Sequence, residues 1–139
     1  MDSPESGPQV SLAIVDASAM AAVVFKEPEG ADVAERLRSH FLVAPRLMAY
    51  ELANTAVMKT KAHPNSAGWI MKALTRALAD DVAITWSDVE YEEVADLAIQ
   101  TGLTAYDASY LWLAEHMHAE LVTLDTPLAK AAAARNKRR

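Results

Sequence analysis

Short, mainly apolar runs alternate with longer segments of helical pattern along the chain. The runs VSLAIV (10–15), FLVA (41–44), VAITW (82–86) and LVTL (121–124) have the length and composition of strands. Between them the pattern predicts helices over residues 17–25, 28–40, 46–61, 66–79, 88–101 and 104–118, and a last helix from residue 127. Strands that alternate with helices indicate an α/β fold with a parallel sheet covered by helices.

The length and composition exclude several classes of protein. The 139 residues fit one domain, and the absence of cysteine excludes disulfides and thiolate metal ligands. No apolar run approaches the roughly 18 residues of a membrane-spanning helix, and residues 1–9 have the polar character of a flexible leader rather than a signal peptide. We therefore expect a cytoplasmic protein that does not enter a membrane, with one domain over residues 10–134 and a basic tail over residues 135–139.

Two aspartates stand directly after predicted strands. Asp16 follows the strand over residues 10–15, and Asp125 follows the strand over residues 121–124. In an open parallel sheet, ligands bind outside the carboxyl ends of the strands, where the strand order reverses. If these two strands are neighbours, both carboxylates face one cleft, where their like charges repel and require a cation. The alternative is that each aspartate only caps the helix that follows it.

Two further acids lie on predicted helices. Thr104 and Asp107 match a capping box, in which a threonine caps the helix and an acid three residues later returns to the cap. Taken alone, that structural role is sufficient to explain Asp107. Glu51 shares a helix face with Leu47 and Met48, so its carboxylate is expected to point inward and to need a metal or a cation. The alternative is a boundary residue whose carboxylate reaches water.

The four acids together suit a hard divalent cation. Oxygen ligands without cysteine favour Mg²⁺ or Mn²⁺, which keep several waters and bind through a few carboxylates and substrate phosphates. Such an ion orients a phosphate, lowers the pKa of a bound water and offsets the charge on the leaving oxygen. The set therefore indicates metal-assisted hydrolysis of a phosphodiester.

Four segments of the chain resemble the PIN-domain ribonucleases, and within them the VapC-type toxins of bacterial toxin–antitoxin pairs. The segments are IVDASAM around Asp16, YELANTA around Glu51, LTAYDASYLWLAE around Asp107 and LVTLDTPLAKAA around Asp125. They occur in the order of that family, and the resemblance extends over residues 10–134. It implies a three-layer α/β/α sandwich with a central parallel sheet of four to five strands.

The resemblance also implies an activity and a set of partners. It implies an endoribonuclease that depends on Mg²⁺ or Mn²⁺, with a catalytic metal site formed by Asp16, Glu51, Asp107 and Asp125. Ser18 matches the small hydroxyl residue that often follows the first aspartate by two, and Thr104 stands three residues before the third acid, as is common in the family. It also implies a homodimer that a cognate VapB-like antitoxin holds inactive. Contact with DNA is implied only indirectly, through that antitoxin.

An RNA substrate requires local cations, because the net charge of the chain is −6. We expect phosphate contacts from basic side chains on the helices over residues 46–61 and 66–79, and from the basic tail. The helical candidates are Arg46, Lys59, Lys61, Lys72 and Arg76. The alternative for each of them is a position on a solvated helix face.

Two other classes of protein share parts of this pattern. A catalytically silent PIN-like module that binds RNA or a partner would keep the fold, but all four acids are present here. A phosphoacceptor receiver domain needs paired acids after its first strand and a lysine near the end of a late strand. In this chain Asp16 is followed by Ala17, and the late strand leads to Asp125. The pattern therefore favours the nuclease.

Overall fold

Four parallel strands form the central sheet of the part of the chain that the structure describes. The structure is a computed structural model that describes residues 11–79 and 84–138. The strands are β1 (Ser11–Val15), β2 (His40–Pro45), β3 (Ile84–Ser87) and β4 (Glu120–Val122), and their order in the sheet is β3-β2-β1-β4. Every neighbouring pair is parallel, which confirms the predicted α/β class. The predicted leader over residues 1–9 and the first two residues of the third predicted strand lie outside the described residues.

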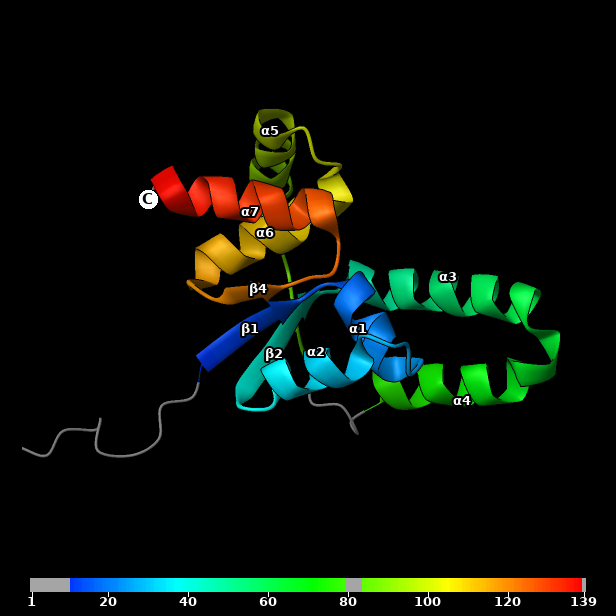
Figure 1. Cartoon of the computed structure of the whole chain (residues 1–139). Helices are drawn as coiled ribbons and strands as arrows, with labels where there is room; N and C mark the ends of the chain where they lie inside the picture. Colours follow the sequence, from blue (N-terminus) through cyan, green and yellow to red (C-terminus); the bar gives the residue numbers. More distant parts are fainter. Residues whose placement is uncertain (1–10, 80–83, 139) are drawn as a thin grey trace, which may run out of the picture.

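Helices cover both faces of the sheet (Figure 1). They are α1 (Ala17–Val24), α2 (Gly30–Leu37), α3 (Leu47–Ala62), α4 (Ala67–Leu78), α5 (Tyr91–Thr101), α6 (Ala105–Met117) and α7 (Thr126–Arg138). Helices α5, α6 and α7 lie on one side, α1 and α2 lie on the other, and α3 and α4 form an antiparallel pair that projects beyond the sheet (Figure 1). The predicted three-layer sandwich is confirmed.

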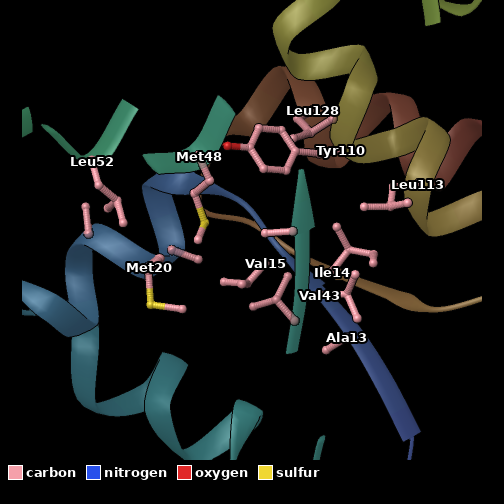
Figure 2. Close-up of a cluster of buried hydrophobic side chains, with 14 of the residues drawn as sticks. Ala13, Ile14, Val15, Met20, Val43, Met48, Leu52, Tyr110, Leu113 and Leu128 are labelled. Atoms are coloured by element: carbon pink, nitrogen blue, oxygen red, sulfur yellow. The ribbon is translucent and has the colours of Figure 1, made fainter. Parts of the chain in front are cut away.

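The core lies between β1 and the helices that cover it. Ala13, Ile14 and Val15 are fully buried, because β1 is a central strand with a helical layer on each face. Most of α6 is buried as well, including every residue from Ala108 to Ala114. Figure 2 shows these strand residues together with Tyr110 and Leu113 of α6. Helix α6, which carries the longest of the four family-like segments, is therefore buried over about half of its length.

The corner between α1 and α2 depends on a glycine. A Cβ at Gly30 would lie 2.2 Å from the carbonyl oxygen of Ala22, a distance that no other residue type accommodates without movement of the backbone. Helix α2 begins at Gly30 rather than at the predicted residue 28. It also ends at Leu37, before the predicted residue 40, because His40 pairs with Ser11 in the sheet.

None of the helices within residues 11–79 and 84–138 is long and apolar enough to span a bilayer.

Candidate active site

The strand order brings two of the predicted acids to the same edge of the sheet. β1 and β4 are parallel neighbours, with Val15 opposite Val122. The strand order reverses here, because β2 and β3 lie on one side of β1 and β4 lies on the other. Asp16, whose N–H donates to the carbonyl of Val122 at 3.1 Å, follows β1 directly. β4 ends at Val122 rather than at the predicted residue 124, so Asp125 stands three residues beyond the strand. The condition for a shared cleft, that the two strands be neighbours, is met.

Asp16 is held in one orientation by three donors. Its Oδ1 accepts hydrogen bonds from the Ala19 N–H at 3.0 Å and from the Ser18 hydroxyl at 2.7 Å, and its Oδ2 accepts one from the Thr123 hydroxyl at 2.6 Å. The residue is only 3% exposed. Asp16 is the N-cap of α1 and also faces the cleft, so the two roles weighed for it are compatible.

Thr123 connects the two halves of this edge, although the sequence pattern did not single it out. Its hydroxyl donates to Asp16 and accepts from the N–H of Asp125 at 2.9 Å. Asp125 in turn caps α7, because its Oδ2 accepts from the Leu128 N–H at 2.9 Å. A hydroxyl residue two positions before a strand-end aspartate is the only sequence signal that could have indicated this role.

Glu51 receives a hydrogen bond from a buried tyrosine. The hydroxyl of Tyr110 donates to Oε1 of Glu51, and the tyrosine itself is almost fully buried. Figure 2 shows the ring of Tyr110 in the core with its hydroxyl directed toward the side of Met48 on α3. Met48 and Leu52 are buried on that helix and Glu51 is half-buried, which agrees with the expected inward face of α3. Tyr110 was not predicted as a site residue.

Asp107 makes only half of the predicted capping box. Thr104 is the N-cap of α6, and its hydroxyl accepts from the Asp107 N–H at 3.1 Å. The reciprocal bond is missing: within the described residues, no donor contacts the Asp107 carboxylate. Capping therefore uses the backbone of Asp107 and leaves its side chain available to a ligand.

Burial and the charges of neighbouring acids raise the pKa values of three of the four acids. Burial raises the pKa of Asp107, and the charges of Asp125 and Asp16 raise it further. Burial also raises the pKa of Glu51, against the hydrogen bond from Tyr110, and the charges of Asp107 and Asp16 add to the rise. The pKa of Asp16 is raised by burial despite its three donors, with a contribution from Asp125.

The negative charge of the site has no cationic partner. Among the residues that the structure describes, no Lys, Arg or His forms an ion pair with Asp16, Glu51, Asp107 or Asp125. Partly buried carboxylates without a counterion are costly, and a bound cation is the usual remedy. The arrangement therefore calls for a positive ligand.

The donor set fits a hydrated divalent cation. No three acidic or histidine side chains in the described ranges are arranged to hold one ion among them. Mg²⁺ and Mn²⁺ do not need such a cage, because they retain several waters and bind through one or two carboxylates plus substrate phosphates. Carboxylate oxygens without thiolates or imidazoles suit these ions.

The structure does not gather the predicted RNA-contacting cations around the acids. Arg46 pairs with Asp88 at 3.2 Å, and Lys59 pairs with Glu27 at 2.5 Å. Lys61 is exposed in the last turn of α3. The remaining two candidates, Lys72 and Arg76, line an apolar pocket between α1, α2 and α4. A role of these side chains in binding RNA stays a prediction.

Comparison with known proteins agrees with this geometry. Residues 13–134 match the PIN domain family. Over 122 residues the chain is 34% identical to Ribonuclease VapC3 from Pyrobaculum aerophilum, a match that covers 84% of this chain and 92% of that protein. The chain therefore belongs to the PIN-domain family, and the VapC type implied by the resemblance is confirmed.

A solved structure has the same fold. The crystal structure of PAE2754 from Pyrobaculum aerophilum superposes with a TM-score of 0.69 and covers 94% of this chain and 97% of its own. The sequence identity is 24%, so this likeness concerns the fold.

Proposed function

We propose that the protein is a metal-dependent endoribonuclease that hydrolyses RNA phosphodiester bonds as the toxin of a toxin–antitoxin pair. The observation that carries the proposal is the set of four carboxylates that have no cationic partner among the described residues, two of which follow neighbouring strands where the strand order reverses. The 34% identity to a protein named Ribonuclease VapC3 supports the choice of RNA as substrate.

The proposed catalytic groups are the acids that the sequence singled out. Asp16, Glu51, Asp107 and Asp125 would surround a hydrated Mg²⁺ or Mn²⁺, with one or two of these carboxylates in direct contact with the ion. When bound, the ion supplies activation of a water and charge stabilisation on the phosphate.

The chain's own contribution is orientation of those carboxylates. Asp16 cannot rotate away from the cleft, because Ala19, Ser18 and Thr123 hold both of its oxygens. The hydroxyl of Tyr110 donates to Oε1 of Glu51 and so holds one of its two oxygens. A site of this kind needs its side chains fixed by supporting hydrogen bonds, and both acids meet that requirement.

Removal of one acid tests the proposal. In Asp16→Asn and in Asp107→Asn, we expect Mg²⁺-dependent RNA cleavage and growth arrest on expression to fall by at least about 100-fold, because each loses a charged ligand. Glu120→Gln, a change at the opposite end of the sheet, is the matched control. Undiminished cleavage in the two aspartate variants would contradict the proposal. A purified wild-type protein that never cleaves RNA, with metal present and antitoxin removed, would instead favour a silent PIN-like binding module.

A cognate VapB-like antitoxin is proposed to neutralise the protein. An apolar pocket of about 500 Å³ supports this, because cations stand among its lining residues, namely Lys26, Arg38, Lys72 and Arg76. Such a pocket suits an amphipathic, acidic segment of a partner. We expect Lys72→Glu with Arg76→Glu to weaken antitoxin binding while leaving RNA cleavage by the free toxin intact. The opposite pattern would favour the RNA contact predicted for these two residues.

A homodimer is proposed as well. Val57 and Met58 on α3 and Met71 on α4 are exposed although apolar, on the helix pair that projects beyond the sheet (Figure 1). Exposed apolar side chains of this kind are typical of interaction surfaces. Sedimentation of the purified protein, with Met58→Lys as the variant expected to dissociate, tests this. The cytoplasmic location stays a prediction.

A further inference from the structure

A pocket of about 600 Å³ adjoins the candidate active site. Ser18 and Glu51 of the candidate active site contribute to its lining. Tyr50, Asn54 and Leu124 line it as well. The volume lies within the range of small-ligand sites. A group bound there would therefore lie beside Glu51, one of the proposed metal-binding acids.

Two exposed side chains, Tyr50 on α3 and Leu124 in the loop between β4 and α7, line this pocket. Tyr50 precedes Glu51 on α3 and is 82% exposed. Leu124 precedes Asp125 and is 44% exposed. An exposed aromatic ring next to a nuclease site offers a stacking surface for an unpaired base. The chain thus places such a surface one residue away from a proposed catalytic acid.

The charges of the pocket disfavour a phosphate and favour a base. Glu27 and Glu29 add to its negative lining, and no Lys or Arg is among the described residues that line it. Lys59 lies close by but is paired with Glu27 at 2.5 Å. A nucleobase carries no charge, and its amino and imino groups donate to carboxylates. Asn54 can both donate to and accept from a base edge.

We propose that this pocket, hereafter the base pocket, binds one unpaired nucleobase of the RNA next to the phosphate that is cut. The inference rests on the proposed function. Tyr50 stacks on the base, while Asn54 and Glu29 contact its edge.

Truncation of the stacking ring tests the base pocket. In Tyr50→Ala we expect the KM for a single-stranded RNA oligonucleotide to rise roughly tenfold with a smaller change in kcat, because stacking is lost while the acids remain. Tyr50→Phe keeps the ring and should lose much less. Tyr91→Ala is the matched control, since Tyr91 is also 82% exposed but does not line the pocket. Equal kinetics of Tyr50→Ala and Tyr91→Ala would overturn the inference.

A second experiment removes the base instead of the ring. An oligonucleotide with one abasic nucleotide beside the cut should be cleaved roughly tenfold less well by the wild type, with little further effect in Tyr50→Ala. If Tyr50→Ala lowered cleavage of the abasic oligonucleotide by the same factor as cleavage of the intact one, the two changes would be independent, and that result would overturn the base pocket. Absence of any cleavage by the wild type would contradict the proposed function instead. Binding of the same oligonucleotides would then decide the base pocket, with equal affinities of Tyr50→Ala and Tyr91→Ala as the result against it.

Discussion

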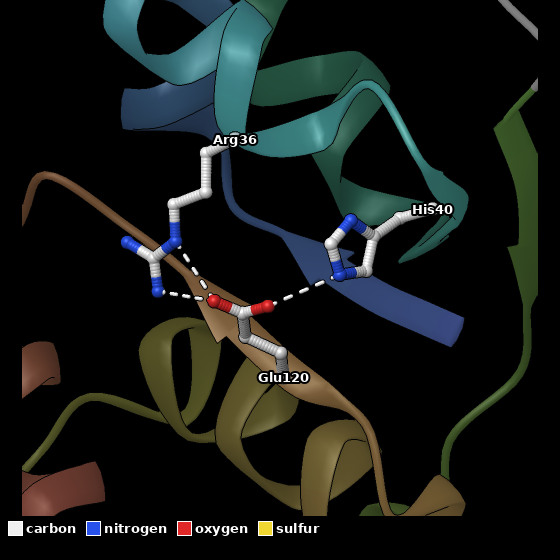
Figure 3. Close-up of polar contacts among 3 residues, drawn as sticks. All are labelled: Arg36, His40 and Glu120. Atoms are coloured by element: carbon white, nitrogen blue, oxygen red, sulfur yellow. Dashed lines mark hydrogen bonds and ion pairs between the residues drawn. The ribbon is translucent and has the colours of Figure 1, made fainter. Parts of the chain in front are cut away.

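The carboxylates at the two ends of the sheet have opposite electrostatic surroundings. At the amino end, Glu120 begins β4, and its Oε1 accepts from Nε and Nη2 of Arg36 at 2.8 and 2.6 Å. Its Oε2 lies 3.2 Å from Nε2 of His40 (Figure 3). At the carboxyl end, Asp16 and Asp107 face other acids and have no ion-pair partner in the described residues.

This difference separates a structural carboxylate from a functional one. Glu120 joins α2, β2 and β4 through its partners, so its charge contributes to the fold (Figure 3). The acids at the carboxyl end repel one another and are partly desolvated, so their charges oppose the fold. Groups that cost stability are expected where a ligand or a reaction requires them.

The largest effect is expected at Asp16, which caps α1 and is also a proposed catalytic residue. Both Asp16→Asn and Asp16→Ala should lower RNA cleavage by at least about 100-fold, since either change removes the carboxylate. Only the alanine variant should also lose about 1 kcal/mol of unfolding free energy, because asparagine still caps α1. Cleavage rates and urea unfolding of both variants test this. Activity retained in the asparagine variant would reduce Asp16 to a cap.

A smaller loss is expected on removal of the donor to Glu51. Tyr110→Phe keeps the buried ring but deletes the hydroxyl that holds Oε1 of Glu51. We expect kcat/KM to fall about tenfold and the Mg²⁺ concentration for half-maximal activity to rise, as for other residues that orient metal ligands. Activity assays across Mg²⁺ concentrations measure both. An unchanged Mg²⁺ requirement would show that the hydroxyl does not position the carboxylate.

The raised pKa of Asp107 predicts a pH dependence of stability with a definite sign. A carboxyl whose pKa is raised on folding binds its proton more tightly in the native state than in the unfolded state. Its ionisation therefore lowers the free energy of unfolding as the pH rises above the pKa of the unfolded state. Without metal, Asp107→Asn should therefore be more stable than the wild type, by an amount that grows as pH rises from about 4. Urea unfolding at several pH values measures the difference. A difference in unfolding free energy between the two proteins that shrinks with rising pH would contradict a raised pKa of Asp107.

The smallest effect is expected at the opposite end of the sheet. Glu120→Gln loses ion pairs to Arg36 and His40, but the Glu120 side chain is 39% exposed and is therefore screened by solvent. We expect a loss of only about 0.5 kcal/mol in unfolding free energy and no change in RNA cleavage. Thermal unfolding and the cleavage assay, run together, check both parts. A large loss of activity would mean that the two ends are coupled.

Much of the site could be predicted because its signals are local in the sequence. Asp16 follows β1 directly, Asp125 follows the apolar run that contains the end of β4, and Glu51 lies beside buried residues of α3. The strands themselves were evident from short apolar runs between helical segments. Patterns of this kind depend on neighbouring residues only, so a single sequence is enough to detect them.

The supporting contacts could not be predicted, because their partners are distant in the chain. Thr123 and Asp16 are separated by 107 residues, and Tyr110 and Glu51 by 59. A helical pattern indicates which face of a helix is buried, but not which side chain of another element meets it. For the same reason the sequence does not indicate that Lys59, one of the predicted RNA contacts, forms an ion pair with Glu27.

The central claim is that the uncompensated carboxyl end of the sheet binds a divalent cation. Calorimetric titration of Mn²⁺ into the wild type, Asp107→Asn and Glu120→Gln tests it most directly, without RNA. We predict binding to the wild type and to Glu120→Gln with equal affinity, and binding at least about tenfold weaker to Asp107→Asn. Equal Mn²⁺ affinity in all three proteins would contradict the account.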